Sequence, residues 1–165
     1  MTRLFFALTL LIVAIAQATI LPAFNVYGIG PNLCLVLLLV WSGLRGVPEG
    51  LIWAFPLGLL LDFLSLAPLG SHGLALAPVA MIGGLARQRV FRSGILVLML
   101  LVISATLAHQ LVASLVAAVG GHGYGLTAAA RLGFLTALLN MVAVPPVYLV
   151  IRSLDRLGVG RAAPA

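Results

Sequence analysis

The sequence predicts an all-α, polytopic membrane protein built as a bundle of six helices. Of its 165 residues, 63% are hydrophobic and only 7% are charged, with a mean hydropathy of +1.25. A soluble domain typically carries roughly 25% charged residues, so this chain cannot cover a water-facing surface. Six apolar runs are separated by short segments rich in Gly, Pro or Arg, and the arginines gather in alternate connections. These three observations define the fold class.

The apolar runs predict one integral membrane domain over residues 1–165. We expect helices at about 4–22, 31–44, 49–65, 73–86, 94–119 and 126–151. Pro48 followed by Glu49 suits the start of the third helix, and Pro145-Pro146 is expected to interrupt the sixth. The three central runs are short for a ~30 Å hydrocarbon core, so they tilt, thin the membrane or are shielded by neighbours. A re-entrant pair formed by the second and third runs is the alternative.

The first run, which follows Arg3, also has features of a signal peptide. The triplet Ala16-Gln17-Ala18 is similar to a cleavage site. The run is nevertheless long enough to span a membrane, and we favour a retained first helix.

The distribution of arginine predicts the topology. The chain has nine arginines and no lysine, against Glu49, Asp62 and Asp155. With six spans, eight of the nine arginines face one side, and only Arg131 falls on the other. By the positive-inside rule both termini are expected in the cytoplasm, and Asp62 and His72 toward the outer face. The eight are Arg3, Arg45, Arg87, Arg89, Arg92, Arg152, Arg156 and Arg161.

The basic charge does not indicate nucleic-acid binding, because the chain has no basic face to present. Its densest cluster is Arg87, Arg89 and Arg92, which we expect in a cytoplasmic loop against anionic headgroups. The single cysteine, Cys34, excludes an intramolecular disulfide and is expected in the core. His72, His109 and His122 lack the spacing of helical metal motifs, so we expect no metal and no cofactor.

Asp62 is the only acidic residue in the interior of the hydrophobic segments. A carboxylate near hydrocarbon is energetically costly, so it indicates a functional or structural role. We expect a structural anchor that accepts hydrogen bonds from the free N–H groups opening the fourth helix and pairs with Arg131, with His72 nearby. Ligand contact and proton chemistry are the alternatives. An intramembrane aspartyl protease needs two carboxylates, and Glu49 and Asp155 are predicted on the opposite side. We therefore expect no catalytic residues.

A face of small residues follows on the sixth segment. Ala129, Gly133 and Ala137 repeat every four residues, and Asn140 lies on the same side. Such faces let membrane helices approach closely, so we expect it to pack inside the bundle, or else against a partner helix or a second copy.

Across residues 30–92 the order of motifs resembles the MreD family of bacterial rod shape-determining membrane proteins. The matching elements are Gly30-Pro31-Asn32-Leu33, Gly46 with Pro48-Glu49-Gly50, Gly58-Leu-Leu-Leu-Asp62, Pro68-Leu69-Gly70, His72-Gly73-Leu74 and Gly83-Gly84-Leu85.

The resemblance implies a non-enzymatic scaffold of cell-wall elongation in the bacterial cytoplasmic membrane. Its implied partners are MreC, a RodA-type polymerase, a penicillin-binding transpeptidase, MreB and membrane lipids. It also implies a likeness in fold to the substrate-binding subunits of energy-coupling-factor transporters. The alternative function is therefore a small solute-binding subunit of that transporter type.

Overall fold

The computed structural model describes residues 2–20, 30–86, 95–121 and 126–156. These residues form six helices and no strand, which confirms the all-helical prediction. The helices are α1 (Thr2–Thr19), α2 (Leu33–Arg45), α3 (Val47–Ser65), α4 (Ser71–Leu85), α5 (Ile95–Val119) and α6 (Leu126–Arg156).

The helix boundaries differ from the expected ones where glycine shapes a turn. Gly46 has φ of 97° and connects α2 directly to α3, which therefore begins two residues earlier than predicted. Gly70 has φ of 90° and lets α4 begin at Ser71 rather than at residue 73. Both backbone conformations favour glycine because it has no Cβ.

The expected interruption of the sixth helix is wrong. α6 continues through Pro145 and Pro146 to Arg156. Membrane helices tolerate proline because local adjustments and neighbouring groups satisfy the backbone oxygens that it frees.

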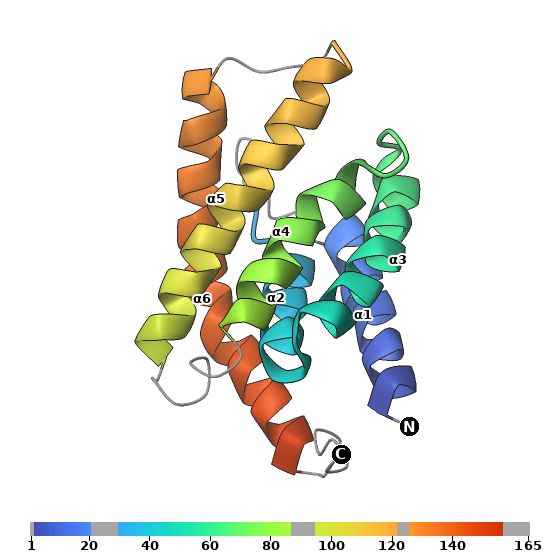
Figure 1. The fold of residues 1–165 in the computed structure, drawn as a ribbon, viewed down its shortest axis with the longest axis vertical. Coiled ribbons are helices and arrows are strands. Elements are labelled where there is room, and N and C mark those ends of the chain that lie inside the picture. Colours follow the sequence, from blue (N-terminus) through green and yellow to red (C-terminus); the bar gives the residue numbers. More distant parts are fainter. Residues whose placement is uncertain (1, 21–29, 87–94, 122–125, 157–165) are drawn as a thin grey trace.

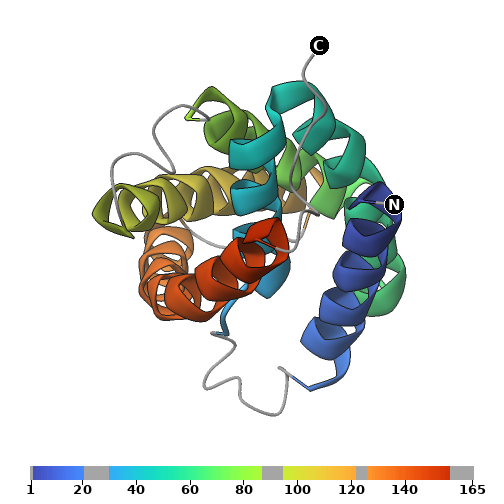
Figure 2. The same cartoon turned by 90° about the horizontal axis from the view of Figure 1, so that it is seen from below.

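The helices surround α2. Residues Cys34–Gly43 of α2 are all buried, and Figure 2 shows this helix in the middle of the bundle. At the upper end of Figure 1, α5 and α6 rise past the turn between α3 and α4. The first turn of α1 and the last turns of α6 both lie at the lower end. The start of the first helix and the end of the last are thus at the same end of the bundle.

Three of the six helices, α3, α5 and α6, contain segments long and apolar enough to cross a membrane. The apolar segments of α1, α2 and α4 are shorter. With 13 residues, α2 is only about 20 Å long. Because it ends beside the start of α3 at the lower end, α2 must begin inside the bundle, and its first N–H groups need partners there.

Glycines bring α2, α3 and α4 into close contact. A Cβ added to Gly58 on α3 would collide with the backbone of Gly73 on α4. A Cβ on Gly83 would likewise collide with the carbonyl oxygen of Leu39, and one on Gly84 with the backbone nitrogen of Val47. Small residues permit this approach in membrane bundles, where helix association depends on van der Waals packing.

Aromatic and charged side chains hold the lower end of α1 against α2 and α3. Phe6 stacks on Trp41, with ring centroids 3.7 Å apart, and meets Trp53 edge-on at 5.4 Å. The guanidinium of Arg3 donates to both carboxylate oxygens of Glu49, at 3.0 and 2.9 Å. Together with the buried Phe6, Leu10 and Ala14, these contacts make α1 part of the core.

The glycine contact between α3 and α4 leads to an asymmetric prediction. Gly58→Ala should lower the stability of the protein in detergent by roughly 1–3 kcal/mol, because the added methyl group forces two backbones apart. Gly73→Ala should be nearly neutral, since its Cβ would meet only Phe55, at the ordinary distance of 3.9 Å. Thermal unfolding of both variants measures the difference, and equal losses of stability would contradict the packing described.

Candidate functional site

The first polar site joins the end of α3 to the start of α4 through the carboxylate of Asp62. Its Oδ2 accepts from the Gly70 N–H at 2.6 Å. Its Oδ1 accepts from the Ser71 hydroxyl at 2.7 Å and from the His72 N–H at 3.1 Å. The Nδ1 atom of the His72 ring lies 2.7 Å from the same oxygen. We call these four residues the polar clasp.

The clasp fixes the tautomer of His72. An ionised carboxylate can only accept hydrogen bonds, so Nδ1 of His72 carries the proton that it shares with Asp62. The Asp62 side chain has no exposed surface, whereas that of His72 is 32% exposed. The carboxylate is therefore enclosed and His72 forms the outer edge of the clasp.

Local sequence explains how the clasp forms. Gly58 and Asp62 are four residues apart and share one face of α3. The close contact at Gly58 brings that face against the start of α4. Leu66 then ends α3 in the left-handed conformation, with φ of 54°, and the chain turns back. The first N–H groups of α4 are thereby presented to the carboxylate, an arrangement favoured by the positive end of the helix dipole.

The expected pair between Asp62 and Arg131 is not formed. None of the described hydrogen bonds or ion pairs of Asp62 involves Arg131. Arg131 is exposed on α6, and within the described residues α6 contacts α5 and α2 but not α3. Glu49 is also remote, because it precedes Asp62 by 13 residues, or about 20 Å, along the same helix.

A second polar site, the polar chain, connects four helices. The Asn140 Nδ2 amide on α6 donates to the Thr106 hydroxyl on α5 at 2.9 Å, and Asn140 Oδ1 accepts from the Asn32 N–H at 2.6 Å. The Asn32 Oδ1 atom accepts from the Gln17 amide on α1 at 3.1 Å and from the Leu35 N–H at 3.0 Å. The Gln17 Oε1 atom accepts from the Cys34 N–H at 3.0 Å.

The polar chain satisfies the start of the buried helix. The N–H groups of Asn32, Cys34 and Leu35 have no earlier turn of helix to bond to, and water does not reach the interior of a membrane bundle. Side chains from α1 and α6, with that of Asn32 itself, supply the missing acceptors. Sequence analysis missed this role for Gln17 and Asn32, although an amide side chain within an apolar run marks such a position.

The small-residue face of α6 points into the bundle. Ala129, Gly133, Ala137 and Asn140 are all buried. A Cβ on Gly133 would lie 3.1 Å from Cγ of Gln110, so this face packs against α5.

The remaining candidates do not form a site in the described residues. No group of three His, Cys, Asp or Glu side chains converges there as a metal site. His109 lies on α5 with its Nε2 atom buried and without a hydrogen-bond partner. His122 and the basic cluster of Arg87, Arg89 and Arg92 lie outside the described residues.

Together, the apolar helices, the glycine contacts and the polar groups that cap buried helix ends define a polytopic helical membrane protein. The chain belongs to the MreD family, because the family model for the rod shape-determining protein MreD matches residues 1–156. Its role thus lies in the determination of rod shape. No curated protein and no solved structure matches the chain.

Two substitutions of Asp62 separate hydrogen bonding from charge. Asp62→Leu removes every acceptor of the clasp and should destabilise the protein by at least about 1–3 kcal/mol for each donor left unpaired. Asp62→Asn keeps one acceptor oxygen and should retain most of the membrane level. Immunoblots of membrane fractions report insertion, and cell shape reports function. A stably inserted Asp62→Asn protein without function would show that the charge itself is required.

The polar chain predicts energetic coupling between α5 and α6. Asn140→Leu and Thr106→Val each break the hydrogen bond between these helices, so a second substitution should add less than the first. A double-mutant cycle of unfolding in detergent should give a coupling of about 0.6–1.7 kcal/mol. Thr9, whose hydroxyl bonds only to a carbonyl of its own helix, provides the matched Thr→Val control. Additive losses for Asn140 and Thr106 would contradict the bond.

Proposed function

We propose that the chain is a non-enzymatic scaffold of the cell-wall elongation machinery, which binds and stabilises MreC and supports the peptidoglycan synthase. The proposal starts from membership of the MreD family of rod shape-determining proteins. The observation that carries the proposal is the state of Asp62, whose carboxylate is fully enclosed and bonded to four donors. A carboxylate held in this way anchors a helix end.

The packing suits a scaffold. Glycine contacts between α2, α3 and α4, with hydrogen bonds at the starts of α2 and α4, fix the inner helices relative to one another. A fixed core presents constant outer surfaces, and a partner with a single membrane span can bind to such a surface without reordering it. On this proposal MreC binds in the membrane, and the RodA-type polymerase, the penicillin-binding transpeptidase and MreB assemble around the pair.

The proposed orientation places the lower end of the bundle in the cytoplasm. Arg3 and Glu49 pair at that end, and the neighbouring Arg45 lies over the Trp41 ring at 5.2 Å. Arginine with tryptophan is typical of a membrane boundary, and the positive-inside rule favours the cytoplasmic side. The start of α1 and the end of α6 lie at the same end, so both termini would be cytoplasmic and the polar clasp would face outward. The membrane is then the bacterial cytoplasmic membrane.

The solute-binding alternative needs convergent polar groups around a cavity. A groove between α5 and α6 has only Gln110 and Ser114 as polar side chains among its seven lining residues, which favours the scaffold.

Depletion of the protein in its own rod-shaped host tests the function. Loss of the protein should produce rounded cells, and the wild-type gene should restore rods. A solute requirement with normal shape would instead support the transporter subunit and contradict the scaffold.

Co-purification tests the partner. The tagged protein and MreC, expressed together and extracted in mild detergent, should elute as one complex. Asp62→Asn should retain MreC, whereas Asp62→Leu should lose it in proportion to its own loss from the membrane. A stable protein that never captures MreC would contradict the proposed binding.

A further inference from the structure

A shallow groove between α5 and α6 is not explained by the polar clasp or the polar chain. It has a volume of about 130 Å³, and the seven residues that line it are Leu107, Gln110, Leu111, Ser114, Ala129, Ala130 and Gly133. Cavities on the order of 150 Å³ hold a group the size of benzene, so this groove has room for one apolar side chain.

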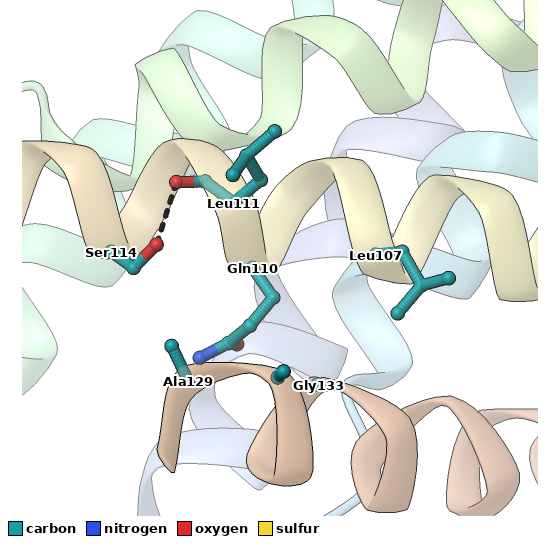
Figure 3. Close-up of a pocket in the computed structure, with 7 residues that line it drawn as sticks. Leu107, Gln110, Leu111, Ser114, Ala129 and Gly133 are labelled. Carbon is teal, nitrogen blue, oxygen red and sulfur yellow. Dashed lines mark hydrogen bonds between the residues drawn. The ribbon is translucent and has the colours of Figure 1, made fainter. Parts of the chain in front are cut away.

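The small residues of α6 create the groove. Ala129 and Gly133 are buried against α5, and Ala130 beside them is exposed. Figure 3 shows the side chain of Gln110 extending from α5 across to Ala129 and Gly133. The aliphatic part of the Gln110 side chain packs over Gly133. A Cβ added at Gly133 would lie only 3.1 Å from Gln110 Cγ. The amide of Gln110 therefore reaches the groove because no larger side chain of α6 blocks it.

The amide of Gln110 has no hydrogen-bond partner among the described residues. Gln110 lies nine residues before Val119, the last residue of α5, which places it about 14 Å inside the helix end. At that depth hydrocarbon supplies neither donor nor acceptor, so an unpaired amide is costly. Ser114 one turn away is different, because its hydroxyl already donates to the Leu111 carbonyl oxygen at 2.8 Å.

Two glutamine side chains can hydrogen-bond to each other. Its amide has both donors and an acceptor, so two glutamines that face each other across a two-fold axis can each donate to the other. Symmetric pairs of this kind form when the same patch of two subunits meets. A lipid chain can fill the groove but cannot bond to the amide.

The apolar surroundings of Gln110 are also suited to a copy of themselves. Leu107 and Leu111 flank the groove on α5 and are 43% and 55% exposed. They provide side chains of the size that the groove admits, and Ala130 lets a second helix approach closely. The patch thus combines a projecting leucine, a matching groove and a self-pairing amide.

We propose that this groove is a homodimer interface in which a second copy of the chain packs α5 against α5, with the two Gln110 amides hydrogen-bonded to each other. The interface is independent of the proposed scaffold function. A monomer could still bind MreC, and a dimer could exist without it.

Cysteine cross-linking in native membranes tests the interface. The only native cysteine, Cys34, is fully buried and is replaced by Ala in all variants. Single cysteines are placed at Gln110 and Ser114. The control is Ile52→Cys on the exposed surface of α3, outside the proposed interface. A disulfide requires Cα atoms about 4.4–6.8 Å apart, so oxidation should link copies through residue 110 or 114 and not through 52. Equal cross-linking at all three positions, or none at any, would overturn the proposal.

Substitutions of Gln110 test the hydrogen bond. Energy transfer between two labelled copies in liposomes measures the dimer. Gln110→Leu should weaken dimerisation roughly 3- to 20-fold, the range expected for one interhelical hydrogen bond in a membrane, and Gln110→Asn should weaken it less. Ala130→Leu should fill the groove and abolish the dimer. Undiminished dimerisation of Gln110→Leu and Ala130→Leu would exclude this surface.

Co-expression with MreC separates the two proposals. If a cysteine at residue 110 forms disulfides only with an MreC membrane helix, and never with residue 110 of a second copy, the groove is the binding site of MreC. The homodimer proposal is then wrong. Retention of MreC by a monomeric Gln110→Leu protein would leave the scaffold proposal intact.

Discussion

The structure depends on the satisfaction of backbone N–H groups at two helix starts, that of α2 inside the bundle and that of α4 at the turn after α3. A helix leaves its first N–H groups without intrahelical partners, and a membrane interior offers no water to replace them. α2 begins inside the bundle, where Asn32, Gln17 and Asn140 supply the acceptors. α4 begins beside α3, where Asp62 supplies them. The polar residues within the apolar segments are thus used largely to allow short helices to exist there.

The same constraint explains why glycine and polar residues occur together. Asp62 reaches the start of α4 only because Gly58 allows the backbone of Gly73 to come close. A larger residue at position 58 would move the donors away from the carboxylate. Close packing and hydrogen bonding are therefore coupled across α3 and α4, and damage to either is expected to affect both. Three of the motifs that resemble the MreD family, residues 58–62, 68–70 and 72–74, fall on this contact.

Gln110 differs from the residues of the polar clasp and the polar chain. Asn140, Thr106, Gln17 and Asp62 all have partners within the chain, whereas the amide of Gln110 has none among the described residues. A polar group that the fold leaves unpaired in an open groove indicates a contact outside the subunit. The outer surface of α5 and α6 is accordingly the proposed site of association between two copies of the chain. The inner helices keep the fold constant.

The sequence by itself determined the membrane class, the six helices and the prominence of Asp62, because hydropathy, helix length and a lone carboxylate are local properties. It also indicated the family through residues 30–92. Only the tertiary structure decided the partners of each polar group. Arg131 was a reasonable partner for Asp62 by topology alone, but α6 packs away from α3. Gln17, Asn32, Thr106 and Asn140 are separated by up to 123 residues in sequence and meet only because α2 begins inside the bundle. Side-chain convergence of that kind depends on how helices are placed in space, which local patterns do not specify.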